Sequence, residues 1–257
     1  MLLPLERIDH PVAAPGSLQG RVVLVTGASG GLGRATALAC ARVGATVVLA
    51  GRKVRALEAV YDEIEALGGP QAAIYPVDLE GAGPGDHDDI VDAVRLQCGR
   101  LDGLVHAAAH FDGLRTIDQT KPLDWLRAQQ VGLNAPVLLT RACLPLLREA
   151  ADAAVVFVFD DPARVGKAYW GSYGVSKFGL AGFASVLHDE QANGPLRVHG
   201  LLPAPMRTTL RRMAYFGEDA TTRPTPDRTG AAVAFLLGAQ AHSLRGKTLD
   251  LRTAQAS

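Results

Sequence analysis

The chain has 257 residues, of which 48% are hydrophobic and 20% are charged. This composition is typical of a folded globular protein and excludes intrinsic disorder. Lys and Arg together number 26, as do Asp and Glu, so the formal net charge is zero. Since there is also no basic block, nothing points to nucleic acid or an anionic membrane as a partner.

Three cysteines, Cys40, Cys98 and Cys143, lie far apart within apolar or helical patterns. Buried free thiols explain them better than a disulfide or a metal site does. The N-terminus has no basic start and no long apolar stretch, and the longest apolar runs, at 153–159 and 231–237, are far shorter than the roughly 20 residues of a membrane span. We therefore expect a cytoplasmic protein that does not enter a membrane.

Strand and helix patterns alternate along the chain. Short β-branched runs bounded by glycine, proline or polar residues predict strands, and apolar residues at helical spacing predict helices. In chain order, the expected elements are strand 21–27, helix 33–45, strand 46–52, helix 54–69, strand 72–79, helix 86–98, strand 101–109, a long helix at 122–148 interrupted by Pro136 and Pro145, strand 153–159, helix 170–191, strand 196–203, helix 229–238 and strand 247–251.

This order of elements predicts the α/β fold class. Continuous apolar strands that alternate with helices indicate a parallel sheet covered by helices on both faces. No repeat and no long linker divides the chain, so we expect a single doubly wound domain over residues 1–257, with residues 1–20 as an N-terminal extension.

A polar, Arg-rich segment at 206–228 is expected to act as a substrate lid. Its arginines include Arg207, Arg211 and Arg212, interleaved with methionine and tyrosine. They favour a solvated lid helix, and the alternative is an anion-binding substrate pocket.

The stretch "TGASGGLGRATA" at 26–37 places three glycines between the first strand and the first helix: Gly27, Gly31 and Gly33. In a dinucleotide-binding turn, such glycines allow a tight turn, close approach of the backbone to a pyrophosphate, and close packing of helix on strand. The free N–H groups of the helix N-terminus then face the phosphates. The sequence therefore predicts a dinucleotide site, with a merely structural turn as the alternative.

The end of the second strand indicates which nucleotide is bound. An acidic residue there usually binds the ribose 2′-hydroxyl of NAD, but this strand ends "AGRK", with Arg52 and Lys53. An arginine can hold a 2′-phosphate through paired hydrogen bonds. NADP(H) is therefore favoured over NAD(H), unless Arg52 is only a solvated charge at a helix start.

The glycine spacing, together with "YGVSK" at 173–177, resembles the short-chain dehydrogenase/reductase family over nearly the whole chain. The details "LAGR", "LVHAAA", "LPLL" and "WGSYGVSKF" look most like the YciK-type bacterial oxidoreductases of that family. The resemblance implies a Rossmann fold in which Tyr173 gives or takes a proton, while Lys177 holds the nicotinamide ribose and lowers the pKa of the phenol. Residues four apart share a helix face, and an ammonium group favours a nearby phenolate.

The resemblance also implies a set of cofactor-binding residues in the glycine turn, at strand ends and after the sixth strand. These are Gly27, Ser29, Gly31, Leu32, Gly33, Arg52, Asp78, Leu79, Ala108, Tyr173, Lys177, Pro203 and Thr208. Asp78 would accept a hydrogen bond from the adenine amine, with a strand-end cap as the alternative.

Two of the four usual catalytic positions of the family differ in this chain. The serine expected 13 residues before Tyr173 is Asp160, and the helix asparagine is Gly132. Asn134 and Ser172 point elsewhere around their helices and are poor substitutes, because neighbouring helix positions differ by about 100°.

Asp160 is nevertheless a candidate catalytic residue. An ionised aspartate can only accept a hydrogen bond, and its charge would keep Tyr173 protonated, which disfavours alcohol oxidation and leaves a slow carbonyl reductase. If burial keeps Asp160 protonated, it could donate as the serine would.

Two functions are therefore carried forward. The first is an NADP(H)-dependent short-chain oxidoreductase acting on a small carbonyl or alcohol substrate, in which Asp160, Tyr173 and Lys177 are catalytic. The second is an NADP(H)-binding protein without significant catalysis, acting as a sensor or partner module.

His106 and His110 straddle a strand end without a third ligand, so no metal site is expected. Through the resemblance, we expect a homodimer or homotetramer that pairs through its long helices.

Overall fold

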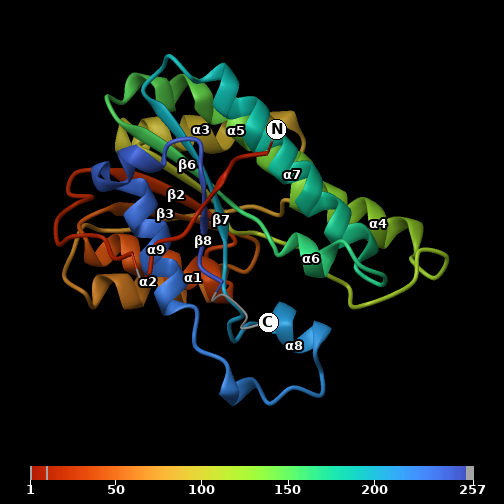
Figure 1. Ribbon diagram of the computed structural model, residues 1–257. Coiled ribbons are helices and arrows are strands. Elements are labelled where there is room, and N and C mark those ends of the chain that lie inside the picture. The colour runs from red at the N-terminus through yellow and green to blue at the C-terminus, as the bar shows by residue number, and fades with distance from the viewer. Residues whose placement is uncertain (1, 10, 253–257) are drawn as a thin grey trace.

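The structure, a computed structural model, describes residues 2–9 and 11–252, and it is built around one sheet of eight parallel strands (Figure 1). Across the sheet the strand order is β1-β8-β7-β6-β5-β2-β3-β4. The strands are β1 (Leu5–Glu6), β2 (Val22–Thr26), β3 (Thr46–Gly51), β4 (Ala73–Pro76), β5 (Gly103–His106), β6 (Ala153–Val158), β7 (Leu196–Leu202) and β8 (Thr248–Asp250).

Helices cover both faces of this sheet. On one face α1 packs against α2 and α9, and on the other α3 packs against α5, with α7 lying on β6 and β7. The helices are α1 (Gly31–Arg42), α2 (Val54–Glu65), α3 (Pro84–Cys98), α4 (Pro122–Gln129), α5 (Ala135–Glu149), α6 (Pro162–Val165), α7 (Gly171–Glu190), α8 (Thr209–Ala214) and α9 (Asp227–Leu237). The doubly wound α/β fold predicted from the sequence is confirmed.

The strands read as continuous apolar runs because both of their faces are buried. In β2, Val23 and Val25 point into the core beneath α1 and α9, whereas Val22 and Leu24 point into the core beneath α3 and α5. All four side chains are at most 5% exposed. A strand with one solvated face would instead alternate apolar and polar residues.

The long helix expected at 122–148 is continuous in the structure but changes from α-helical to π-helical geometry for one turn. A π-helical turn at Gln130–Asn134 separates α4 from α5. Pro136 directly follows this π-helical turn and, lacking an N–H, cannot donate to a carbonyl of that turn, whereas Pro145 lies inside α5 without ending it. The interruption predicted at Pro136 therefore takes the form of a π-helical turn beside that proline, and the one predicted at Pro145 does not occur.

The first residues of the chain add a short edge strand that the sequence did not predict. β1 pairs with β8, where the Thr248 amide donates to the Pro4 carbonyl over 2.8 Å. Lys247 Nζ also lies 2.9 Å from Glu6 Oε2. A two-residue strand has too short a pattern to be recognised, and its pairing partner lies at the other end of the chain.

The cysteines are free thiols, as predicted, with Cys40 and Cys143 buried. Burial raises the pKa of each of these two thiols to about 12, so both stay protonated and unreactive. None of the helices in the described part of the chain has the length and apolar character needed to cross a bilayer.

Candidate active site

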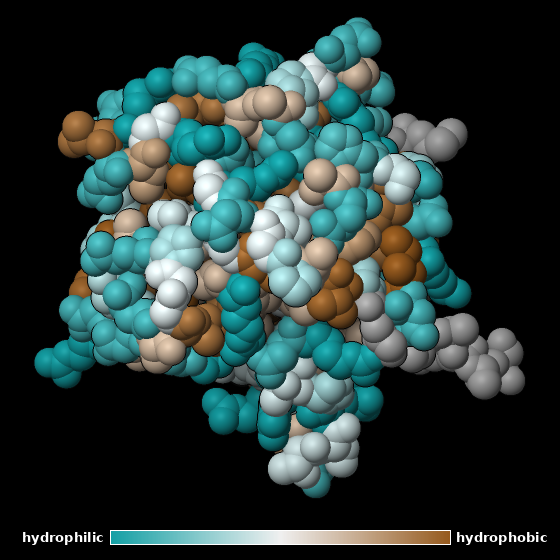
Figure 2. Space-filling model, turned by 90° about the vertical axis from the view of Figure 1, so that its left-hand side faces the viewer, coloured by the Kyte–Doolittle hydropathy of each residue, from teal (hydrophilic) through white to brown (hydrophobic). Residues whose placement is uncertain are grey.

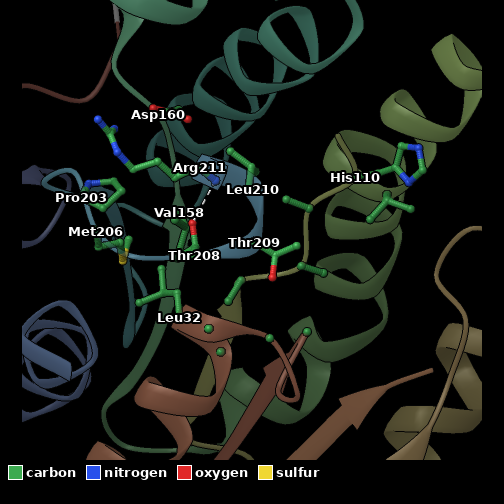
Figure 3. Close-up of a pocket in the computed structure, with 18 of the residues that line it drawn as sticks. Leu32, His110, Val158, Asp160, Pro203, Met206, Thr208, Thr209, Leu210 and Arg211 are labelled. Atoms are coloured by element: carbon green, nitrogen blue, oxygen red, sulfur yellow. Dashed lines mark hydrogen bonds between the residues drawn. The ribbon is translucent and has the colours of Figure 1, made fainter. Parts of the chain in front are cut away.

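A cleft of about 820 Å³ opens at the carboxyl ends of the central strands. Strands β3 and β4 follow β2 in one direction across the sheet, whereas β6, β7 and β8 follow β5 in the other. The cleft lies where the loops after β2 and β5 diverge, which is where doubly wound sheets bind their ligands. Figure 3 shows Asp160 and Arg211 on one side of this cleft and His110 on the other.

All of the site residues predicted from the sequence line this one cleft. They come from the turn after β2, the ends of β3 and β6, the loops after β4, β5 and β7, and helix α7: Gly27, Ser29, Gly31, Leu32, Gly33, Arg52, Asp78, Leu79, Ala108, Asp160, Tyr173, Lys177, Pro203 and Thr208.

The glycine turn after β2 has no room for side chains at two of its glycines. Gly27 has a φ of +66°, and a Cβ there would lie 2.8 Å from the Ala108 Cα. A Cβ on Gly33 would lie 2.1 Å from the Gly27 carbonyl oxygen. These two glycines are therefore required by the turn itself, whether or not a nucleotide is present.

Gly31, which also lines the cleft, differs from them because a side chain there would meet side chains and not backbone. A Cβ on Gly31 would meet only side chains, at 3.2 Å from Thr208 Cγ2 and 3.6 Å from Pro226 Cγ. Figure 3 shows Thr208 just above Leu32, the residue that follows Gly31. Gly31 therefore tolerates a side chain only if Thr208 shifts, and it lies at the N-terminus of α1, where free N–H groups can face an anion.

Arg52, at the end of β3, has a largely free guanidinium group. Its side chain is 57% exposed, and Nη1 lies 4.0 Å from Glu80 Oε2. Glu80 is held more closely by Arg127, at 2.6 Å. Arg52 can therefore turn toward an anion in the cleft. Asp78 also lines the cleft, and its Oδ1 accepts a hydrogen bond from the Glu80 amide over 3.2 Å, the strand-end cap that the sequence left open.

Tyr173 and Lys177 lie one turn apart on α7 and are both buried, at 4% and 5% exposure. Lys177 Nζ lies 5.5 Å from the centre of the Tyr173 ring and donates a hydrogen bond to the Val158 carbonyl over 2.9 Å. Burial lowers the pKa of Lys177 to about 8, and the charge of Asp160 opposes this shift. The pair thus has the close arrangement that the YGVSK motif implies.

Asp160 is the hydrogen-bonding partner of the Tyr173 hydroxyl. The Tyr173 hydroxyl donates to Asp160 Oδ2 over 2.8 Å. Burial, followed by the charge and hydrogen bonding of Asp160, raises the pKa of Tyr173 well above its ordinary value, and Arg164 opposes this shift. The phenol is therefore protonated at neutral pH, and its proton is directed at a carboxylate.

Comparison with known proteins decides the family. The model of the short chain dehydrogenase family matches residues 21–217. Over 233 residues the chain is 34% identical to the oxidoreductase YciK of Escherichia coli K12, a match that covers 91% of this chain and 92% of YciK. The chain belongs to the short-chain dehydrogenase family.

Solved structures of this family have the same fold. A short chain dehydrogenase from Pseudomonas syringae superposes with a TM-score of 0.91 at 36% identity, over 96% of this chain and 100% of that one. A short-chain dehydrogenase from Shigella flexneri in complex with NADP has a TM-score of 0.88 at 33% identity, over 93% of this chain and 99% of that one. The same TM-score and coverage hold for one from E. coli CFT073 in complex with NADPH, at 34% identity. These two complexes favour NADP(H) over NAD(H), as the sequence does.

The position of the family's asparagine cannot hold a side chain in this short-chain dehydrogenase. Gly132 lies in the π-helical turn, and a Cβ on it would lie 2.6 Å from Ser176 Oγ and 2.9 Å from Ser176 Cβ. Asn134 is exposed and donates to Gln130 Oε1 over 3.2 Å. As expected, it does not line the cleft.

Sequence reasoning missed Arg164, which pairs with Asp160. Arg164 lies on α6 and donates from Nη2 to Asp160 Oδ1. In "DDPAR" the arginine follows Asp160 by four residues, a spacing that would have revealed the pair if α6 had been recognised as a helix. α6 is only one turn long, which is too short for a periodic pattern to show.

Arg252, near the C-terminus, was also missed. Its Nη1 lies 2.6 Å from Asp161 Oδ1, and its Nε lies 2.8 Å from Asp250 Oδ1. Asp161 in turn caps α6 by accepting from the Ala163 amide. The second aspartate of the pair therefore fixes the helix that carries Arg164.

Among the lid arginines considered from the sequence, only Arg211 lines the cleft. Arg211 and Arg223 share Glu218, at 2.6 Å each. The guanidinium of Arg211 lies 4.6 Å from the centre of the Tyr215 ring. Both arginines are thus paired with a carboxylate within the segment, and the Arg211 side chain is only 13% exposed.

The two histidines near the end of β5 have separate partners. His106 Nε2 is hydrogen-bonded to Thr140 Oγ1 over 2.8 Å, and burial lowers the pKa of His106 to about 3, so the ring is neutral. His110 Nε2 is hydrogen-bonded to Asp112 Oδ2 over 2.8 Å. Each ring is thus engaged in its own contact.

Proposed function

We propose that this protein is an NADP(H)-dependent oxidoreductase that reduces the carbonyl group of a small molecule. The observation that carries the proposal is that the glycine turn, Arg52, Tyr173 and Lys177 line one cleft. NADP(H), when bound, supplies or accepts the hydride. The N-terminus of α1 at Gly31 suits a pyrophosphate, and the exposed, loosely paired guanidinium of Arg52 suits a 2′-phosphate.

In this proposal Tyr173 is the proton donor. Because its pKa is raised, the hydroxyl stays protonated at neutral pH. A protonated phenol can donate to a carbonyl oxygen, but it cannot act as the base that takes a proton from an alcohol. Lys177, with its pKa lowered to about 8, carries a positive charge over much of the neutral range and stabilises negative charge at Tyr173 during the transfer.

We expect slow turnover of simple carbonyls, because the hydroxyl of Tyr173 already donates to Asp160. A substrate oxygen must displace this charge-assisted hydrogen bond, which is stronger than a bond between neutral groups. Gly132 supplies no amide in the place where the family has an asparagine. The same two features support the second candidate, an NADP(H)-binding protein without significant catalysis.

Two measurements on one sample distinguish these candidates. Titration with NADPH and with NADH gives the two dissociation constants, and NADPH consumption is then followed over a panel of carbonyl compounds. Tight NADPH binding with turnover of some member supports the reductase, and tight binding without turnover supports the non-catalytic candidate. If neither nucleotide binds, both are wrong. Tyr173→Phe is the control, because it removes only the donated proton.

We further propose that the chain works as one domain, that residues 206–228 act as its lid, and that it forms a homo-oligomer through α4 and α7. Figure 2 shows that hydrophilic side chains cover most of the face on the α2 side of the molecule. On the other side, α4 and α7 expose large apolar residues: Leu123, Leu126, Val175, Phe178 and Val186. Such exposure favours association. If the chain does not form a homo-oligomer, sedimentation equilibrium at several concentrations will show a monomer.

A further inference from the structure

Asp160 does not stand alone beside Tyr173, because Arg164 binds its other oxygen. Oδ2 accepts from the Tyr173 hydroxyl, and Oδ1 accepts from Arg164 Nη2 and, over 2.7 Å, from the Asp161 amide. The side chain of Asp160 is 8% exposed, and that of Arg164 is 26% exposed. A carboxylate this deeply buried needs a partner for its charge, and Arg164 is that partner.

The surroundings fix Arg164 in this position. Its guanidinium carbon lies 4.9 Å from the centre of the Trp170 ring and 6.0 Å from that of Tyr215. A planar guanidinium stacks on aromatic faces and is only weakly hydrated, so this site retains it in its charged form. The helix that carries Arg164 is itself capped by Asp161, which Arg252 holds.

The other charged groups around this site are also engaged. Lys177 faces Tyr173 and bonds the Val158 carbonyl, the carboxylate of Asp161 pairs with Arg252, and Arg211, beside Tyr215, pairs with Glu218. Arg164 is thus the group that contacts the Asp160 carboxylate with opposite charge.

We propose that Arg164 is a positioning residue for Tyr173, which acts by holding Asp160 toward the phenol and cancelling its charge. The Asp160–Arg164 pair then serves as one neutral unit at the position where related enzymes have a serine. The catalytic consequence rests on the proposed function, whereas the pairing itself does not.

The proposal has a consequence for the dependence of stability on pH. In Arg164→Met, an ionised Asp160 would lie buried with no cation in contact with its carboxylate, so the folded state would favour the protonated carboxyl. The unfolded state then binds fewer protons than the folded state, and the free energy of unfolding falls as the pH rises. With Asn at position 160 no charge remains, and the loss of Arg164 should have no such pH dependence.

The test is a double-mutant cycle of urea unfolding across a pH series. Arg164→Met should have a lower free energy of unfolding than the unmodified protein, and this deficit should grow between about pH 5 and about pH 8. In the Asp160→Asn background, the deficit in the free energy of unfolding that Arg164→Met causes should stay constant over the same range. Arg95→Met, which breaks an exposed pair with Glu149, is the control and should show no comparable trend. A deficit of Arg164→Met that does not vary with pH, or that varies equally in both backgrounds, would overturn the proposal.

Turnover provides the second readout if NADPH consumption is detected. Carbonyl reduction by Arg164→Met should be retained at about pH 5 and fall by roughly tenfold toward about pH 8, while Arg164→Lys, which keeps the charge, should follow the unmodified profile. Loss by the same factor at every pH in both variants would indicate a structural role alone. If NADPH does not bind at all, the proposed function fails, but the unfolding cycle still tests the pairing.

Discussion

At the scale of single residues, the hydroxyl of Tyr173 is the group on which the proposed reduction depends. Its proton points at Asp160 over 2.8 Å. A serine in that position would instead donate to a substrate oxygen and leave the phenol free to do the same. Under the proposed function, an aspartate in place of a serine therefore removes one hydrogen-bond donor to the substrate oxygen and engages the phenol that would supply another.

We expect Asp160→Ser to raise the turnover of simple carbonyls by about tenfold, because it restores one donor and removes the competing acceptor. NADPH consumption by both proteins across a pH series is the measurement, and Tyr173→Phe in each background gives the residual rate. If the unmodified protein is already fast and Asp160→Ser is slower, Asp160 is a recruited catalytic group rather than a loss.

A second residue-scale prediction concerns Arg52. A charge-assisted contact to a 2′-phosphate stabilises the complex by roughly 1.5–3 kcal/mol, so NADPH should bind at least about tenfold more tightly than NADH. Arg52→Ala should remove most of that preference in fluorescence titrations. Arg55→Ala, an exposed arginine of α2 outside the cleft, is the matched control. Equal affinities of the unmodified protein for NADPH and NADH would show that Arg52 does not bind the 2′-phosphate.

At the scale of elements, the π-helical turn between α4 and α5 decides what position 132 can hold. Ser176 of α7 fills the space that a side chain there would need, and its hydroxyl donates to the Tyr173 carbonyl over 2.7 Å. The sequence alone suggests that restoring an asparagine at Gly132 would improve catalysis. The contact between the two helices removes that option.

Gly132→Ala should therefore reduce the free energy of unfolding by about 1–3 kcal/mol, since the added Cβ overlaps Ser176 in a packed interface. Combining it with Ser176→Gly should recover part of the loss, in excess of the sum of the single effects. Urea unfolding gives these values. Gly85→Ala in α3 is the control, because a Cβ there meets nothing within 4 Å. A neutral Gly132→Ala would show that the helices separate easily.

The glycine turn before α1 gives a second prediction at this scale. Gly31→Val should leave the protein folded and abolish nucleotide binding, because its side chain would enter the cleft opposite Thr208. Gly33→Ala should instead impair folding, since its Cβ would overlap the Gly27 carbonyl. Circular dichroism and NADPH titration separate the two outcomes. A folded Gly31→Val variant that binds NADPH normally would place the cofactor elsewhere.

At the scale of the whole molecule, a partly buried ion cluster connects the strands with α9. Asp152, at the start of β6, accepts from Arg197 Nε over 2.7 Å and from Arg21 Nη2 over 2.5 Å. Arg197 is 2% exposed and also donates to the carbonyls of Leu236 and Leu237. Burial raises the pKa of Asp152, but the hydrogen bonds from Arg197 and Arg21 outweigh it and lower this pKa to about 2.

Because its folded-state pKa is depressed, Asp152 contributes stability above about pH 4 and loses it as the pH falls through about 2. Asp152→Asn should cost about 3 kcal/mol at neutral pH, since it leaves Arg197 without its anion, and the gap to the unmodified protein should narrow on acidification. Urea unfolding at about pH 7 and about pH 3 is the measurement. Asp88→Asn, in an exposed pair with Arg141, should change stability by less than about 0.5 kcal/mol. If the difference in the free energy of unfolding between the two proteins is the same at both pH values, the charge of Asp152 does not stabilise the fold.

The sequence by itself determined the features that depend on local pattern. The order of strands and helices, the parallel sheet covered on both faces and the free thiols are confirmed, because periodicity and composition record them directly. The glycine turn and the Tyr173–Lys177 spacing were also readable, since each depends on residues close together in the chain. The roles of those residues stay predictions.

Only the tertiary structure decided the contacts between distant segments. The lack of space at Gly132 comes from the approach of α7, the pairing of β1 with β8 joins the two ends of the chain, and Arg252 reaches Asp161 across the sheet edge. The pairing of Asp160 with Arg164 needed a one-turn helix whose pattern is too short to recognise. Packing and ion pairs depend on where side chains meet in space, which the periodicity of a single element does not specify.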